Sequence, residues 1–173
     1  GNPDGGTNWE AALKQANDLQ GRSGVKKHII FLSDGNPTYR TTSYSGCYSY
    51  SLWGWTAHPE YTTPESCRAQ GHTWGKNPDG GSEGAYGAGS SDDYGFNYAA
   101  ALAEANRRGD AALYVVKTST DANKMADLAA EANAVNGKEF DGTNAANLTK
   151  AFDQIYSTIT SSAKIKVFTI ADT

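Results

Sequence analysis

Apolar positions along the chain follow two periods, one typical of helices and one typical of strands. Residues 9–20 carry apolar side chains at helical spacing, and this pattern stops at Gly21, which predicts an amphipathic helix. Residues 28–32 form a continuous apolar run that ends in Ser-Asp-Gly-Asn-Pro. Such a run predicts a strand that is covered on both faces, as in a parallel sheet.

The second half of the chain continues this alternation of helices and strands. The expected elements are an alanine-rich helix at 96–108 closed by Gly109, a strand at 113–116, a helix around 125–132, a short strand around Phe140, an amphipathic helix at 148–159 and a closing strand around 165–169. The order predicts an α/β fold, a doubly wound, Rossmann-like parallel sheet with flanking helices. Ligands of such folds bind outside the carboxyl ends of the strands.

Residues 39–94 interrupt this order. The stretch is dense in Tyr, Trp, Ser and Gly and shows no helical period. A loop of this length inside a compact domain is usually functional or disordered, and its aromatic content favours an ordered arm. We therefore expect one domain, formed by residues 1–38 and 95–173, with an inserted arm at 39–94.

The two cysteines of the chain, Cys47 and Cys67, both lie in this arm. A disulfide between them would close the insertion, and it would place the protein in an oxidising, extracellular compartment. Two reduced thiols are the simplest alternative. A zinc site formed with His58 and His72 is a further alternative, although its spacing matches no usual zinc arrangement.

Composition narrows the classes of function. With 173 residues the chain is long enough for one domain with an adequate core, and its net charge of −4 argues against a nucleic-acid partner. No apolar run approaches the roughly 20 residues that span a bilayer, so we expect no membrane insertion. No phosphate-binding glycine loop is present, and we expect no enzyme activity.

Candidate chemistry lies in two short motifs. Gly5-Gly6-Thr7-Asn8 opens the first helix, and Ser33-Asp34-Gly35 ends the first strand. The threonine hydroxyl and the aspartate carboxylate are oxygen ligands that suit a hard cation such as Mg²⁺. Each residue also has a reading without metal, because Thr7-x-x-Glu10 fits a capping box and aspartate favours turns.

Together these motifs resemble the second and third segments of the metal-ion-dependent adhesion site of von Willebrand factor A domains. The resemblance implies that Thr7 coordinates the cation when ligand is bound and that Asp34 coordinates it directly or through water. The cation would be Mg²⁺, or Mn²⁺ or Ca²⁺ in its place, while Ser33 and Gly35 shape the site. The family's first segment, Asp-x-Ser-x-Ser on the first strand, is absent. We therefore expect an incomplete metal site and, as a partner, the missing N-terminal part of the same domain.

The resemblance implies a cell-surface adhesion module that binds a host protein or extracellular-matrix ligand. The aromatic arm is similar to arms inserted in tip adhesins of sortase-assembled Gram-positive pili, which implies an extracellular location on a bacterial surface or pilus. The alternative function is a lectin-like module that binds a glycan through the arm, with Trp53, Trp55 and Trp74 as the ligand-binding residues. Sensitivity to a chelator distinguishes the two.

Overall fold

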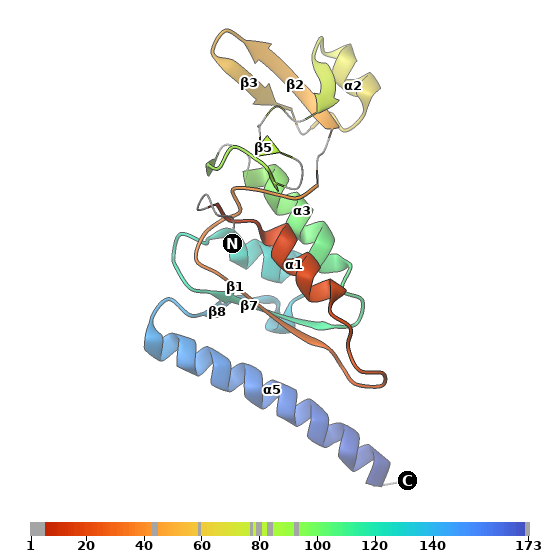
Figure 1. The fold of residues 1–173 in the computed structure, drawn as a ribbon, viewed down its shortest axis with the longest axis vertical. Helices are drawn as coiled ribbons and strands as arrows, with labels where there is room; N and C mark the ends of the chain where they lie inside the picture. Colours follow the sequence, from red (N-terminus) through yellow and green to blue (C-terminus); the bar gives the residue numbers. More distant parts are fainter. Residues whose placement is uncertain are drawn as a thin grey trace. The chain divides into compact units, whose positions relative to one another are not determined.

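The computed structural model describes residues 6–42, 45–58, 60–76, 78, 81–82, 85–91 and 94–171 (Figure 1). The chain divides into two compact units. Unit 1 comprises Gly1–Ala11 and Pro37–Ala101, and unit 2 comprises Ala12–Asn36 and Leu102–Thr173.

Unit 2 contains a parallel sheet of three strands in the order β1-β7-β8. The strands are β1 (His28–Ser33), β7 (Ala112–Lys117) and β8 (Phe140–Asp141). All three lie where the apolar pattern predicts strands, and both pairings are parallel. Parallel neighbours need crossover connections, which here contain helices. The predicted α/β class with a parallel sheet is therefore confirmed.

The helices also follow the predicted periods. They are α1 (Trp9–Asp18), α3 (Tyr94–Asn106), α4 (Lys124–Glu131) and the first part of α5 (Ala145–Ala171). The 3₁₀ turn η2 (Val135–Gly137) was not predicted. Helices α1 and α3 begin in unit 1 and end in unit 2. Gly109 follows α3 with a φ of 66°, a left-handed conformation that favours glycine after a helix end.

One apolar cluster of unit 2 joins the sheet to α5. Its buried members come from β7, β8 and α5, and Leu148 and Ile159 pack against them. The buried members are Tyr114, Val116, Phe140, Ala151 and Ile155. The amphipathic stripe of α5 thus covers the part of this sheet face that β7 and β8 form.

The prediction that β1 is covered on both faces is wrong. Ile29 and Phe31 are each 6% exposed, whereas Ile30 is 38% and Leu32 is 42% exposed. The cause is the position of β1 at the edge of the described sheet, where the cluster beneath α5 does not reach. The sequence of β1 is typical of a strand with both faces covered, yet half of its apolar side chains are accessible to solvent.

The closing strand predicted around 165–169 is also wrong, because α5 continues to Ala171. No glycine or proline occurs between Gly142 and the end of this helix, so nothing stops the amphipathic segment that begins at Ala145. Alternation over five residues is too short a pattern to compete with a helix already formed. Across the described ranges, no helix is long and apolar enough to cross a membrane.

Unit 1 contains an antiparallel sheet in the order β3-β2-β4 and a smaller β5–β6 pair. The elements are β2 (Ser45–Ser51), β3 (Gly54–Ala57), α2 (Pro64–Ala69), β4 (Thr73–Lys76), β5 (Gly81–Ser82) and β6 (Ala85–Tyr86). The arm contains the short helix α2, although its sequence shows no helical period. Thr63 and Ser66 form a capping box at the start of α2, and a helix of six residues is too short to show a period.

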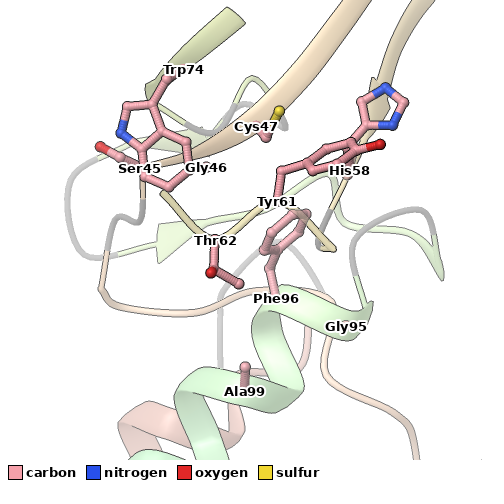
Figure 2. A pocket seen from close by; sticks show the side chains of 11 residues that line it. Ser45, Gly46, Cys47, His58, Tyr61, Thr62, Trp74, Gly95, Phe96 and Ala99 are labelled. Carbon is pink, nitrogen blue, oxygen red and sulfur yellow. The ribbon is translucent and has the colours of Figure 1, made fainter. Parts of the chain in front are cut away.

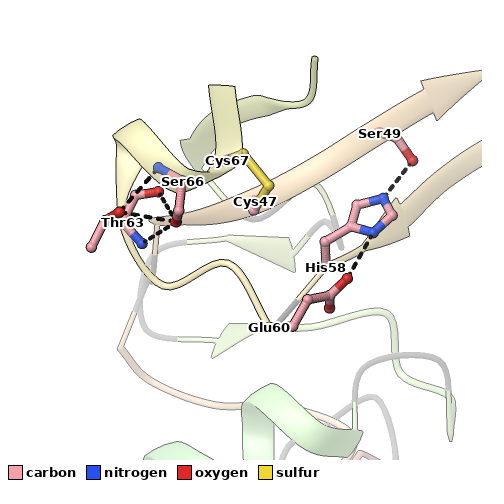
Figure 3. Close-up of a disulfide and its surroundings, with 7 residues drawn as sticks. All are labelled: Cys47, Ser49, His58, Glu60, Thr63, Ser66 and Cys67. Atoms are coloured by element: carbon pink, nitrogen blue, oxygen red, sulfur yellow. Dashed lines mark hydrogen bonds and ion pairs between the residues drawn. A yellow bond between two sulfur atoms is a disulfide. The ribbon is translucent and has the colours of Figure 1, made fainter. Parts of the chain in front are cut away.

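The predicted disulfide is present. Cys47 on β2 and Cys67 on α2 are bonded, with Cα atoms 5.5 Å apart, and both residues are buried (Figure 3). Because the sulfurs are bonded to each other, the alternatives of reduced thiols and of a zinc site are wrong. The disulfide ties the short helix to the central strand of the arm sheet.

Replacement of both cysteines by serine is expected to destabilise the arm by about 3 kcal/mol, since the bond closes a loop with a sequence separation of 20. Urea unfolding of the variant against wild type measures this change. Intact mass after alkylation, with and without prior reduction, checks the bond itself. Two alkylated cysteines in the unreduced protein would contradict the assignment.

Candidate functional site

Thr7 is held by its main chain while its hydroxyl makes no hydrogen bond to the described residues. The Thr7 N–H donates to Thr38 Oγ1 at 2.9 Å, and its carbonyl accepts from the N–H groups of Thr38 at 2.9 Å and Tyr39 at 3.0 Å. These bonds lie within unit 1. The segment before α1 is therefore fixed in a way that leaves a neutral oxygen ligand available.

Gly6, directly before Thr7, lies close to the segment that contains Thr38 and Tyr39. A Cβ atom at Gly6 would clash with the ring of Tyr39. The second glycine of the motif is thus required by the Tyr39 ring. Gly5 lies outside the described residues.

The capping-box reading of Thr7 is wrong. The side chain of Asn8 caps α1 instead, because its Oδ1 accepts from the Ala11 N–H at 3.0 Å. Glu10, only 3% exposed, accepts from the backbone N–H of Thr41 at 2.7 Å and of Thr42 at 2.9 Å. The Glu10 carboxylate therefore holds the chain after β1 and does not close a box on Thr7.

Residues 37–42 have little regular structure, and α3 supplies a second support for them. The fully buried Asn97 donates from Nδ2 to the Pro37 carbonyl at 3.0 Å, and its Oδ1 accepts from Arg40 Nη1 at 3.0 Å. The Arg40 guanidinium also lies 5.7 Å from the centre of the Phe96 ring. Sequence reasoning missed these residues, although an asparagine within an alanine-rich helix is a usable signal.

Asp34 belongs to unit 2 and directly follows β1. Its carboxylate is exposed and makes no hydrogen bond or ion pair with the described residues. Ser33 forms the turn instead, because its hydroxyl donates to the Gly35 carbonyl at 2.8 Å. The reading of Asp34 as a residue whose side chain stabilises the turn is therefore not supported by its contacts.

Asn36 fixes the same loop from the other side. It is 7% exposed, its Nδ2 donates to Asn123 Oδ1 at 2.8 Å, and its Oδ1 accepts from the Lys124 N–H at 2.9 Å. Asn36 thus caps the start of α4 from a distant part of the chain, a role that the local sequence of neither segment reveals.

Thr7 and Asp34 offer oxygen donors of the kind that a hard cation takes, but few of them. Mg²⁺ prefers about six oxygen ligands, some of them waters, and these two residues supply only two. Across the described parts of the chain, no group of three or more His, Cys, Asp or Glu side chains could hold a metal ion. Each residue therefore has the chemistry of a magnesium ligand, Thr7 in unit 1 and Asp34 in unit 2.

The three candidate tryptophans do not form one platform. Trp53 is 96% exposed beyond the end of β2, while Trp55 pairs with Tyr50 and Trp74 pairs with Cys47 across the arm sheet. Positions 50 and 47 of one strand point to opposite faces, so Trp55 and Trp74 do as well. At most one of these two rings can serve a ligand on a given face.

A cavity of about 620 Å³ lies within unit 1 between the arm sheet and α3. Trp74, Tyr61 and Phe96 contribute aromatic walls, and His58 lies on its border (Figure 2). Ser49 Oγ lies 2.8 Å from Nε2 of His58 (Figure 3). The His58 ring also stacks on His72 at a centroid distance of 4.0 Å. The size and mostly apolar lining are typical of small-molecule pockets.

His28 lies on β1 in a partly buried position. Burial lowers its pKa, and the positive charge of Lys26 lowers this pKa further. Its Nδ1 lies 3.0 Å from the hydroxyl of Tyr114, whose own pKa is raised by burial. His28 is therefore neutral at pH 7 and forms a structural hydrogen bond.

Comparisons of the chain with protein-family models, with curated proteins and with solved structures found no match. The family resemblance of the segments around Thr7 and Asp34 therefore stays a prediction. The contacts of these residues, given above, are the structural basis for any functional proposal.

Substitution of Glu10 by glutamine should destabilise the protein by about 1–3 kcal/mol, because the neutral amide replaces a buried acceptor of several hydrogen bonds. Chemical unfolding measures the change. The matched control is Glu65→Gln on the exposed face of α2, which should change stability by less than about 0.5 kcal/mol. Equal stability of the two variants would contradict the role of Glu10.

Proposed function

We propose that this chain is part of a metal-ion-dependent adhesion module on a bacterial surface, which binds a host or matrix ligand through Mg²⁺ held in part by Thr7 and Asp34. One observation carries the proposal. Both residues sit in segments fixed by hydrogen bonds, yet the hydroxyl of Thr7 and the carboxylate of Asp34 have no partner among the described residues.

The anchoring contacts support this assignment. Thr38, which binds the main chain of Thr7, lies four residues after Asp34 in the sequence. Asn36, between them, is held at the start of α4. Each donor is held within its own unit before a ligand arrives, so its segment loses little conformational freedom on binding.

The ligand types also suit capture of an acidic partner. The hydroxyl of Thr7 is neutral and Asp34 carries one negative charge, so one of the two positive charges stays uncompensated by this pair. A carboxylate of the bound protein would balance it and complete the coordination. The remaining protein donors would come from the part of the domain that carries Asp-x-Ser-x-Ser. That part is accordingly the first partner that we propose for this chain.

Binding of a glycan is the second candidate, and the cavity in unit 1 favours it. Trp74 lines this cavity together with Tyr61 and Phe96, and aromatic faces pack on the apolar faces of sugar rings. This function would proceed without a metal ion, so a chelator separates the two candidates. Adhesion lost in EDTA supports the metal site, and adhesion retained in EDTA supports the cavity.

Asp34→Asn should remove the local response of the protein to Mn²⁺, because an amide oxygen is a weaker ligand than a carboxylate. Substoichiometric Mn²⁺ is expected to broaden the amide NMR signals around Thr7 and Asp34 in the wild-type protein. The variant should lose this broadening and keep its melting temperature.

Asp153→Asn is the matched control, since Asp153 is an exposed aspartate on α5 in unit 2. Its broadening pattern should equal that of the wild type. Uniform broadening across the surface, or a pattern that Asp34→Asn leaves unchanged, would remove Asp34 from the proposed site.

A further inference from the structure

The outer edge of β1 presents backbone groups that no described strand pairs with. The carbonyls of Lys27 and Ser33 accept from β7 and from the residue after it, at 2.9 Å and 3.0 Å. Hydrogen bonding alternates along a parallel strand, so His28, Ile30 and Leu32 direct their backbone N–H and C=O groups to the other side. On that side the described sheet has no neighbour.

The side chains of the same edge are apolar and accessible. Ile30 and Leu32 are 38% and 42% exposed, although the run His28–Ser33 has the composition of a strand with neighbours on both sides. Exposed edges of this kind are templates for pairing with another chain. A further strand along β1 would satisfy the backbone groups and cover both side chains.

Opposite charges flank this edge. Lys26 precedes β1 and Asp34 follows it, both side chains are exposed, and neither makes an ion pair with the described residues. The two charges are equidistant from Ile30 in the sequence. Two copies of this edge in antiparallel orientation therefore place the positive charge of one copy opposite the negative charge of the other.

We propose that β1 pairs with β1 of a second copy of this chain, in antiparallel orientation, about a two-fold axis at Ile30. In this register Ile30 faces Ile30, and His28 of one copy faces Leu32 of the other. Lys26 of each copy then lies opposite Asp34 of the other.

The antiparallel arrangement uses every outward group of the edge. Residues that direct both N–H and C=O outward form the doubly hydrogen-bonded pairs of an antiparallel ladder, and His28, Ile30 and Leu32 all meet this condition. A two-fold axis makes each contact away from the axis occur twice, so the Lys26–Asp34 attraction occurs twice. An unrelated strand would match this charge pattern only by coincidence.

The dimer is expected to be weak, because one short strand pair buries much less than the roughly 1,200 Å² of stable interfaces. Sedimentation of the wild-type protein in EDTA, from about 10 μM to about 1 mM, should show the mass rise from 18.4 kDa toward twice that value. EDTA keeps the result independent of the proposed metal site.

Ile30→Lys places two like charges opposite each other on the axis and should raise the dissociation constant at least about tenfold. Leu19→Lys is the matched control, because Leu19 is a 69% exposed apolar residue outside the strand and away from Lys26 in the sequence. It should leave dimerisation unchanged. Circular dichroism confirms that both variants remain folded.

A charge reversal tests the register without altering the apolar edge. Lys26→Glu and Asp34→Lys should each weaken the dimer at low salt, and the double variant should restore it, because the pair is then reformed with reversed signs. A monomer at all concentrations, a dimer that Ile30→Lys leaves intact, or a double variant weaker than both single ones would overturn the proposal.

Discussion

The segment 37–42 needs partners for its backbone, and this need organises unit 1. These residues have almost no regular structure, so buried side chains must supply the hydrogen bonds that a helix or sheet would supply. The Glu10 carboxylate and the Asn97 amide do so from α1 and α3. Loss of either group would leave buried polar atoms without partners, which costs more than the bond itself contributes. The position of Thr7 depends on the same segment through Thr38.

Local pattern predicted the elements well where one period extends over many residues. The helix around 148–159 and the strand at 113–116 each bury a face or a run that the sequence shows directly. Local pattern gave a wrong prediction where the structure of a segment depends on residues far from it in the sequence. The 165–169 segment alternates like a strand, but it continues a helix that begins twenty residues earlier at Ala145. The coverage of β1 depends on where α5 packs, which no residue of β1 encodes.

Among the residues of the candidate site, some could be found from local motifs and others could not. Thr7 and Asp34 stand out because their motifs are short and contiguous. The side chains that fix them, Asn36 and Asn97, act across separations of 87 and 60 residues and carry no local signature. A buried asparagine becomes informative only when its partners are known, since its amide must be satisfied from both ends.

Asp34 connects the two proposals, and its carboxylate cannot serve both at once. Coordination of Mg²⁺ would place a divalent charge where the dimer requires the ammonium group of Lys26 from the other copy. The two cations would repel each other at this site. Metal binding and dimerisation are then antagonistic, and because linkage is reciprocal, each must weaken the other by the same factor. The exposed edge of β1 would thus be engaged mainly when the cation is absent, and free for another strand when the metal site is filled.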